Sequence, residues 1–331
     1  MTSSQRARRI RFYRTGALLV LLLAALCAPA QQPAKIPVVA MLASHAAVTD
    51  ATHEQLREGL RAFGYEDGKN IRVEIVTAAG RVDRVQALAD GLVSQNVDVI
   101  VCANETTIRA ALKATTKIPI VMTGFGYDPV ALGLVDSLGR PNGNLTGIHA
   151  LLAGLDAKRL EILKEGLPRL TRVAVFWEAP FGTHALEEVR AAGRSLGLQV
   201  ELIEVHGARE LEAAFKTAKQ KRVSAASFIW SPTFAFHSDE LTALAVQSGL
   251  PMIGVYLPTS NPWLLAYGTD TWESFRRAGY FIDRLLKGAK PADLPIEQLS
   301  RYKLAVNLKT ASALGVKLPQ SILLRADEVI Q

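Results

Sequence analysis

The side chains best suited to hold a small polar molecule come directly after short runs of apolar residues. The candidate binding residues are Ser44, Asn104, Glu105, Thr106, Thr123, Tyr127, Asp128, Trp177, Thr233, Phe234, Tyr256 and Asp270. Their hydroxyl and amide groups can hydrogen-bond a solute, and backbone amides at a helix start near Thr106 can hold a carboxylate. A carboxylate of Glu105, Asp128 or Asp270 can hold an ammonium group through charge-assisted hydrogen bonds. This combination predicts a binding site for a small organic solute, such as an amino acid or another carboxylate-bearing compound.

Aromatic side chains are concentrated in the same segments. The chain has 22 Phe, Tyr and Trp residues, of which ten lie at or just past the end of an apolar run: Phe125, Tyr127, Trp177, Phe181, Trp230, Phe234, Phe236, Tyr256, Trp263 and Tyr267. Their concentration favours a solute with an apolar or planar part. Packing in the hydrophobic core is the alternative for each of them, and it is the preferred interpretation for Trp230, which lies inside an apolar run.

The sequence offers no convincing catalytic site. Residues 193–197 match the GxSxG pattern, but a nucleophile elbow needs a strand before the serine and a helix after it. Here the predicted order is reversed, so we expect Ser195 at the C-terminal end of a helix. Because no acid, base and nucleophile converge elsewhere, we predict no catalytic residues and no enzymatic activity.

Metal and nucleotide motifs are incomplete as well. Residues 53–57 begin like HExxH, but position 57 is arginine, and nearby His45 and Asp50 do not complete a tetrahedral ligand set. Residues 124–126 lack the third glycine of a dinucleotide-binding loop, and no P-loop sequence occurs. We therefore expect neither a metal site nor a cofactor.

Alternating strands and helices must position the candidate residues. Apolar or alternating runs predict strands at residues 38–41, 70–76, 97–102, 118–122, 173–177, 199–205, 225–230, 251–256, 264–267 and 302–307. Amphipathic stretches predict helices near residues 56–63, 85–93, 106–115, 186–196, 210–219, 238–248, 270–286 and 308–314. This alternation predicts parallel sheets, and ligands bind outside the carboxyl ends of parallel strands. The candidate residues follow those ends.

The same order of elements occurs twice. Residues 36–107 and residues 171–236 both read as strand, helix, strand, helix, strand and polar loop. Repeats of this length predict an α/β fold of two similar doubly wound parallel-sheet lobes with a cleft between them. We expect one lobe at residues 36–148 and about 268–302, and the other at 149–267 and about 303–331, joined by a multi-stranded hinge.

The first 30 residues have the pattern of an export signal. Five arginines and no acid occupy residues 6–14, an apolar stretch covers residues 16–27, and Ala-Pro-Ala at residues 28–30 fits the cleavage pattern. The apolar stretch is shorter than the ~20 residues that a membrane-spanning helix needs. We predict a signal peptide at residues 1–30 and a periplasmic protein. Lipid attachment at Cys27 is the less favoured alternative, because Leu26 is bulky for the position before a lipidated cysteine.

Removal of this segment changes the charge balance. The whole chain has a formal net charge of +7, and loss of the five arginines leaves +2. A nearly neutral protein has no general electrostatic attraction for nucleic acid, so we expect no nucleic-acid partner. Cys102 is the one cysteine that remains, so no intramolecular disulfide is possible and the fold must depend on its core.

Several longer segments carry a family resemblance. They are residues 58–65 with 68–71, residues 118–121 with 128–129, residues 133–147, and residues 306–315 with 319 and 325–330. Through them the chain resembles the substrate-binding proteins of ABC transporters, in the TrpX-like family with a type I periplasmic-binding fold. The resemblance covers nearly the whole mature chain.

The resemblance implies a periplasmic receptor that closes around a small solute and docks on an inner-membrane ABC permease, and we expect a monomer. Some members of the family are associated with aromatic amino acids, and in such proteins the loops at residues 104–106, 123–128, 233–234 and 270 line the cleft. Glu105 and residues 256–260 depart from the family pattern, so the ligand is not transferred with the resemblance. An exported hydrolase on the same scaffold and a ligand sensor for a membrane signalling protein are the alternatives.

Overall fold

The computed structural model describes residues 35–44, 50–125, 128–151, 154–179, 182–231, 233–234, 237–257 and 261–331. The predicted signal peptide, Cys27 and Tyr127 lie outside the described residues. The chain divides into a short unit, Met1–Ile36, and a main unit, Pro37–Gln331, which contains the helices and strands given below. Within the described ranges no helix is long and apolar enough to cross a membrane.

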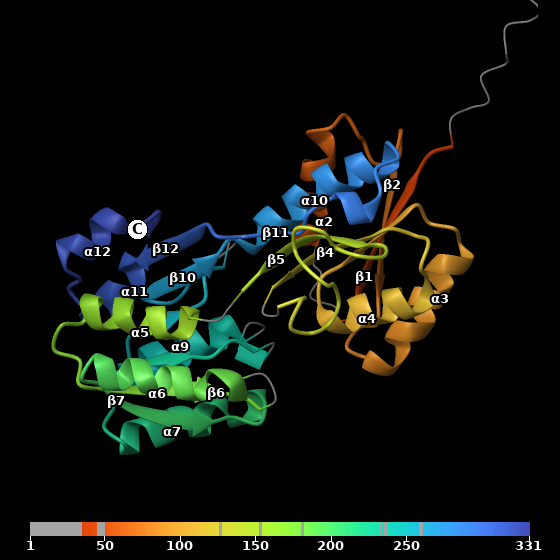
Figure 1. Ribbon diagram of the computed structural model, residues 1–331. Helices are drawn as coiled ribbons and strands as arrows, with labels where there is room; N and C mark the ends of the chain where they lie inside the picture. Colours follow the sequence, from red (N-terminus) through yellow and green to blue (C-terminus); the bar gives the residue numbers. More distant parts are fainter. Residues whose placement is uncertain are drawn as a thin grey trace, which may run out of the picture. The chain divides into compact units, whose positions relative to one another are not determined.

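The first sheet of the main unit has six strands, and each neighbouring pair is parallel (Figure 1). The strand order is β11 (Glu297–Gln298), β5 (Leu145–Ala150), β4 (Ile120–Phe125), β3 (Val99–Cys102), β1 (Val38–Ala43) and β2 (Arg72–Thr77). Between β1 and β3, Val39 lies beside Val99 and Met41 beside Val101. β1 and β3 are apolar at every position because helices cover both faces of the sheet.

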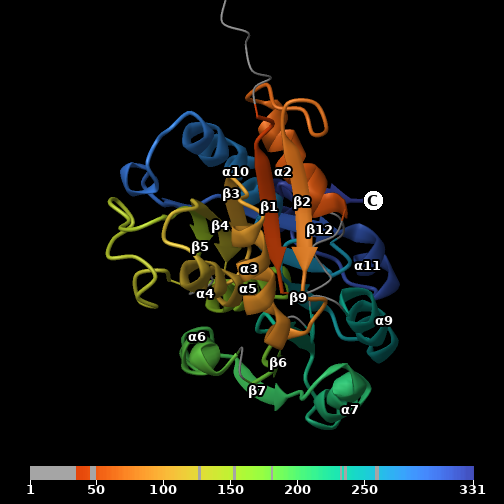
Figure 2. The same cartoon turned by 90° about the vertical axis from the view of Figure 1, so that its right-hand side faces the viewer.

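Alternate residues of β1 face different helices. Val39 and Met41 pack into a core with α2 (Asp50–Arg61) and α10 (Thr271–Leu286). Ala40 and Leu42 pack into a second core with α3 (Val85–Ser94) and α4 (Glu105–Ala114). Figures 1 and 2 both show α10 beside α2, although some 200 residues of sequence separate these helices.

Two glycines allow α2 and α10 to approach each other closely. A Cβ atom on Gly59 would lie 2.1 Å from the backbone oxygen of Arg276, and a Cβ on Gly279 would lie 2.3 Å from the backbone of Gly59. No other residue type fits such a backbone contact without movement of a helix. This crossing attaches a late segment of the chain to the first sheet.

The second sheet has seven strands. The order is β13 (Glu328–Ile330), β12 (Tyr302–Asn307), β10 (Leu265–Thr269), β9 (Met252–Gly254), β8 (Ala225–Phe228), β6 (Arg172–Trp177) and β7 (Gln199–Glu204). On one face lie α7 (Leu211–Gln220) and α9 (Ser238–Ser248); on the other lie α5 (Leu155–Gly166), α6 (Leu186–Ser195), α11 (Leu308–Ala313) and α12 (Gln320–Arg325). The described residues also form short 3₁₀ helices at η1 (Val82–Arg84), η2 (Thr183–Ala185), η3 (Ala208–Glu210) and η4 (Pro291–Asp293).

The two sheets have the same strand order. Strands β5-β4-β3-β1-β2 of the first sheet correspond to β10-β9-β8-β6-β7 of the second, and each series gains further strands at the β5 or β10 edge. The predicted fold class of two similar α/β units is thereby confirmed. The position of Ser195 at the end of α6 is confirmed as well.

Five elements differ from the sequence-based expectation: β5, α5, β11, α12 and β13 have no counterpart there. Thr146 and His149 interrupt the apolar pattern of β5, and Gly147 has a φ of 128°, yet all six residues of the strand are buried. The strands β11 and β13 are too short for their periodicity to be visible. The second sheet is also not wholly parallel, because β12 runs antiparallel to β10.

Candidate functional site

A hydrogen bond joins two neighbouring strand ends of the first sheet. Ser44 follows β1, Asn104 follows β3, and the Asn104 Nδ2 donates to the Ser44 Oγ at 2.8 Å. Asn104 has an extended backbone and caps α4: its Oδ1 accepts from the Thr107 backbone N–H at 3.1 Å, while its own N–H donates to the Thr107 Oγ1. The cap therefore holds the Asn104 amide, and with it the Ser44 hydroxyl, beside the start of α4.

Glu105 and Asp128, the acidic candidates beside the first sheet, already accept hydrogen bonds from other groups of the chain. The Arg109 Nε donates to the Glu105 Oε1 at 2.7 Å, one turn along α4. The Asp128 Oδ1 accepts from the backbone N–H groups of Val130 at 2.9 Å and of Ala131 at 3.2 Å. Thr106, in the first turn of α4, is exposed.

Thr123 is buried in the described conformation. Its side chain has 0% exposure, and its Oγ1 donates to the Cys102 backbone oxygen at 3.5 Å. Its own carbonyl accepts from the Ser274 Oγ on α10 at 3.2 Å. The structure thus places Thr123 within the packed core rather than on an accessible surface. Burial also raises the pKa of the neighbouring Cys102 thiol to about 12, so this cysteine is no thiolate nucleophile.

A second hydrogen bond joins the matching strand ends of the second sheet. Glu178 follows β6, Thr233 follows β8, and the Thr233 Oγ1 donates to the Glu178 Oε1 at 2.9 Å. The backbone oxygen of Glu178 accepts from the Gly182 N–H at 2.9 Å, which holds the turn after β6. The Glu178 Oε2 is shielded from solvent and has no hydrogen-bond partner among the residues that the structure describes.

The aromatic candidates of the second sheet belong mainly to its cores. Phe234 has 0% exposure, and its ring centroid lies 5.4 Å from that of Phe228. Trp177 is half-buried against the core formed with α5 and α6, and Trp230 packs against the opposite core. The interpretation of Trp230 as a core residue agrees with this packing.

Tyr256 is 7% exposed and lies beside a cation. Its hydroxyl donates to the Glu328 Oε2 at 3.3 Å, and the Lys303 Nζ lies 5.4 Å from the ring centroid. Burial raises the pKa of Tyr256, against the opposing effect of the Lys303 charge. The ring is therefore neutral and fixed from two sides.

Asp270 lies where the chain leaves the second sheet for α10. Its Oδ1 accepts from the Trp272 backbone N–H at 3.0 Å and caps the helix. Its Oδ2 accepts from the Lys303 Nζ at 3.0 Å and from the Arg276 Nη2 at 3.3 Å. The hydrogen bond to Asp270 raises the pKa of Lys303. Two cations therefore neutralise this carboxylate.

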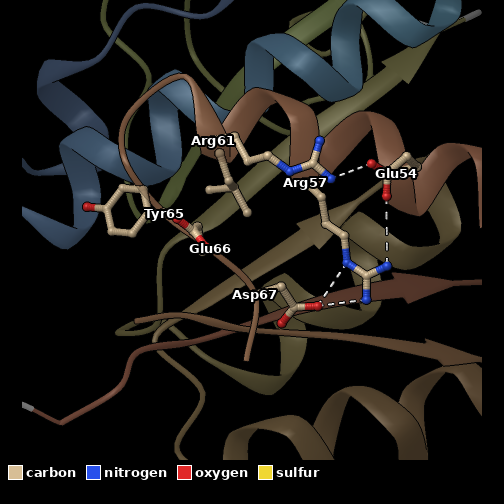
Figure 3. Close-up of a pocket in the computed structure, with 7 residues that line it drawn as sticks. Glu54, Arg57, Arg61, Tyr65, Glu66 and Asp67 are labelled. Carbon is tan, nitrogen blue, oxygen red and sulfur yellow. Dashed lines mark hydrogen bonds and ion pairs between the residues drawn. The ribbon is translucent and has the colours of Figure 1, made fainter. Parts of the chain in front are cut away.

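Two surface depressions of the described residues lie away from these strand ends. One, of about 300 Å³, is lined by Glu54, Arg57, Leu60, Arg61, Tyr65, Glu66 and Asp67 on α2 and the loop after it (Figure 3). Arg57 lies between Glu54 and Asp67 there, and its Nη2 is 2.7 Å from the Asp67 Oδ2. The other, of about 660 Å³, lies over α2 and α10. In the first depression the charges pair with one another, so we place the candidate site at the strand ends.

The residues brought together therefore differ in part from the predicted set. Ser44 with Asn104, and Asp270 with its two cations, form clusters at strand ends, whereas Thr123 and Phe234 are buried. Glu178 is absent from the predicted set, although Trp177, the residue before it, belongs to that set; the signal that points to Glu178 is its place directly after β6. In the described part of the chain no group of three His, Cys, Asp or Glu side chains could hold a metal ion.

The chain matches the family described as ABC transporter substrate binding protein over residues 35–330, and it belongs to this family. A tyrosine-binding protein of Clostridioides difficile (strain R20291) is 25% identical over 285 residues, which cover 84% of this chain and 80% of that protein. The resemblance found in the sequence is thus confirmed.

Solved structures show the same fold. A conserved domain protein from Vibrio cholerae is 25% identical with a TM-score of 0.76, over 89% of this chain and 100% of that chain. An ABC domain from Streptococcus pneumonia, in complex with L-Trp, is 24% identical with a TM-score of 0.75, over 89% of this chain and 99% of that chain. The architecture is that of the type I periplasmic binding proteins, and the matched family is one of substrate-binding proteins.

Proposed function

We propose that this protein is the solute receptor of an ABC import system and that its solute is an amino acid with an aromatic side chain. The predicted signal peptide supports a periplasmic location, where a monomeric receptor delivers the solute to an inner-membrane permease. The tyrosine-binding relative and the L-Trp complex of similar fold support the solute class.

The observation that carries the proposal is the matched pair of hydrogen-bonded strand ends. Ser44 and Asn104 follow β1 and β3, while Glu178 and Thr233 follow β6 and β8, which hold the same positions in the second sheet. Ligands bind at such carboxyl ends in open α/β sheets. Polar groups fixed in advance at both edges lose little entropy when a small zwitterion binds.

Binding at both edges explains how a receptor reports its solute. A solute that contacts both lobes stabilises a closed arrangement by its differential affinity for that arrangement. The predicted lobes, residues 36–148 with about 268–302 and residues 149–267 with about 303–331, would then move as units. The strand-end loops supply the contacts, and the segments that connect the sheets supply the hinge.

A thermal-shift screen tests the solute class. The purified protein is heated with L-tyrosine, L-tryptophan, L-phenylalanine, L-leucine or D-ribose at equal concentration. Ligands that bind the native state stabilise it by mass action, by about 2.7 kcal/mol at a hundred times Kd, so the aromatic amino acids should raise Tm most. A rise with ribose alone, or with none of the amino acids at millimolar concentration, contradicts the proposal.

A further inference from the structure

We propose that the Glu178 carboxylate holds the ammonium group of the solute, an assignment that rests on the proposed amino-acid receptor function. Glu178 follows β6 at the carboxyl edge of the second sheet, where its Oε1 accepts from Thr233. The Oε2 is shielded from solvent without a partner among the described residues, and it is the atom that would receive the ammonium donor.

Comparison with the other strand-end acids singles out Glu178. Glu105 pairs with Arg109, Asp128 accepts two backbone N–H groups, and Asp270 is bound by Lys303 and Arg276. For Glu178 the described residues supply one neutral hydroxyl donor and no cation within ion-pair distance. Among these four acids, Glu178 is therefore the one whose negative charge the described residues leave without a cation.

Binding of an ammonium group at the Glu178 Oε2 is also energetically favourable. A buried polar atom without a hydrogen-bond partner costs free energy, and a carboxylate oxygen costs more than a neutral one. An ammonium group satisfies that oxygen and neutralises the charge in a single charge-assisted contact. Thr233 and the Gly182 N–H hold the side chain and the backbone of Glu178, so the geometry is prepared before the solute arrives.

The assignment is tested by titration calorimetry with L-tyrosine and L-tryptophan and with their analogues that lack the amino group, 3-(4-hydroxyphenyl)propanoate and 3-(indol-3-yl)propanoate. Wild-type protein should bind the amino acids at least tenfold more tightly than these analogues. Glu178→Gln keeps the shape and the acceptor for Thr233 but removes the charge. It should weaken amino-acid binding about 10- to 100-fold and leave analogue binding unchanged.

Glu187→Gln is the matched control, since Glu187 is an exposed acid on α6 that pairs with Arg190 and Arg194. Its affinities should equal those of the wild type. Equal affinity of the wild type for an amino acid and its analogue overturns the assignment without any variant. So does a Glu178→Gln protein that binds both compounds as the wild type does, or that loses affinity for both equally. Absence of wild-type binding to both amino acids contradicts the proposed function itself.

Discussion

Polar side chains at the sheet edges are held by bonds within the chain itself. Asn104 caps α4 with one atom of its amide and orients Ser44 with the other. Asp270 caps α10 and also binds Lys303 and Arg276. A substitution at such a position therefore changes stability as well as affinity, and the two effects must be measured separately.

Asn104→Ala removes both roles of the amide, and Asn104→Asp removes only the Nδ2 donor. Loss of an N-cap costs about 1 kcal/mol, so the free energy of unfolding without ligand should fall by that amount in the alanine variant. Aspartate retains the cap and places a negative charge at the helix start, which is favourable. Urea denaturation of both variants checks this, and equal stability losses in the two would contradict the role as a cap.

The Asp270–Lys303 pair predicts a dependence of stability on alkaline pH. Asp270 raises the pKa of Lys303 above its ordinary 10.5, so the folded state holds this proton more tightly than the unfolded state. The stabilisation is complete below pH 10.5 and is lost as the pH rises through the folded pKa. Lys303→Met should therefore be less stable than the wild type at pH 8, and the difference should shrink above about pH 10.5.

Lys216→Met provides the control for the alkaline experiment. Lys216 pairs with Glu212 on the surface of α7, where both side chains are largely exposed. Exposed pairs contribute ~0–1 kcal/mol, so this variant should follow the wild type throughout the pH series. A constant difference between Lys303→Met and the wild type up to pH 11.5 would refute the pairing.

At the scale of elements, the crossing of α2 and α10 determines how the late helix joins the first sheet. Gly59→Ala brings a methyl group to 2.1 Å from a backbone oxygen, and such overpacking should lower the free energy of unfolding by about 1–3 kcal/mol. Gly91→Ala in α3 meets nothing within 4 Å, and there the alanine should stabilise the protein by about 0.5–1 kcal/mol. Urea midpoints of the two variants measure the contrast, and two changes of the same sign would contradict it.

Elements with a regular hydrophobic period could be predicted from the sequence, and elements shaped by tertiary contacts could not. β1 and β3 are continuous apolar runs and lie within two residues of the predicted bounds. α5 carries Arg159, which is 1% exposed because its Nη1 pairs with Asp156 and its Nε donates to the Tyr267 carbonyl. A charge buried by such partners breaks the amphipathic pattern, so the helix had no periodic signal.

The candidate site could be predicted only in its location. Topology places the strand ends at one edge of each sheet, so Ser44 and Asn104 were identified correctly as neighbours of that edge. Which acidic side chain lacks a partner cation depends on tertiary contacts, and a local sequence pattern does not reveal these contacts. Arg109 pairs with Glu105, whereas Glu178 accepts from the Thr233 hydroxyl and pairs with no cation in the described structure.

At the scale of the whole molecule, one α/β unit occurs twice with the same strand order, and β11 and β12 extend the two sheets at equivalent edges. The duplication presents equivalent strand ends twice, and each presents a hydrogen-bonded pair of polar residues. In the proposed receptor function, each of the two edges supplies contacts to one small solute.

Titration calorimetry of the protein with L-tyrosine, L-tryptophan and L-phenylalanine, after bound solute has been removed by unfolding and refolding, tests the central claim most directly. The account predicts one binding site per chain for at least one of the three and a negative heat-capacity change from burial of the aromatic ring. Absence of binding heat with all three at several temperatures, while the refolded protein unfolds cooperatively, would contradict it.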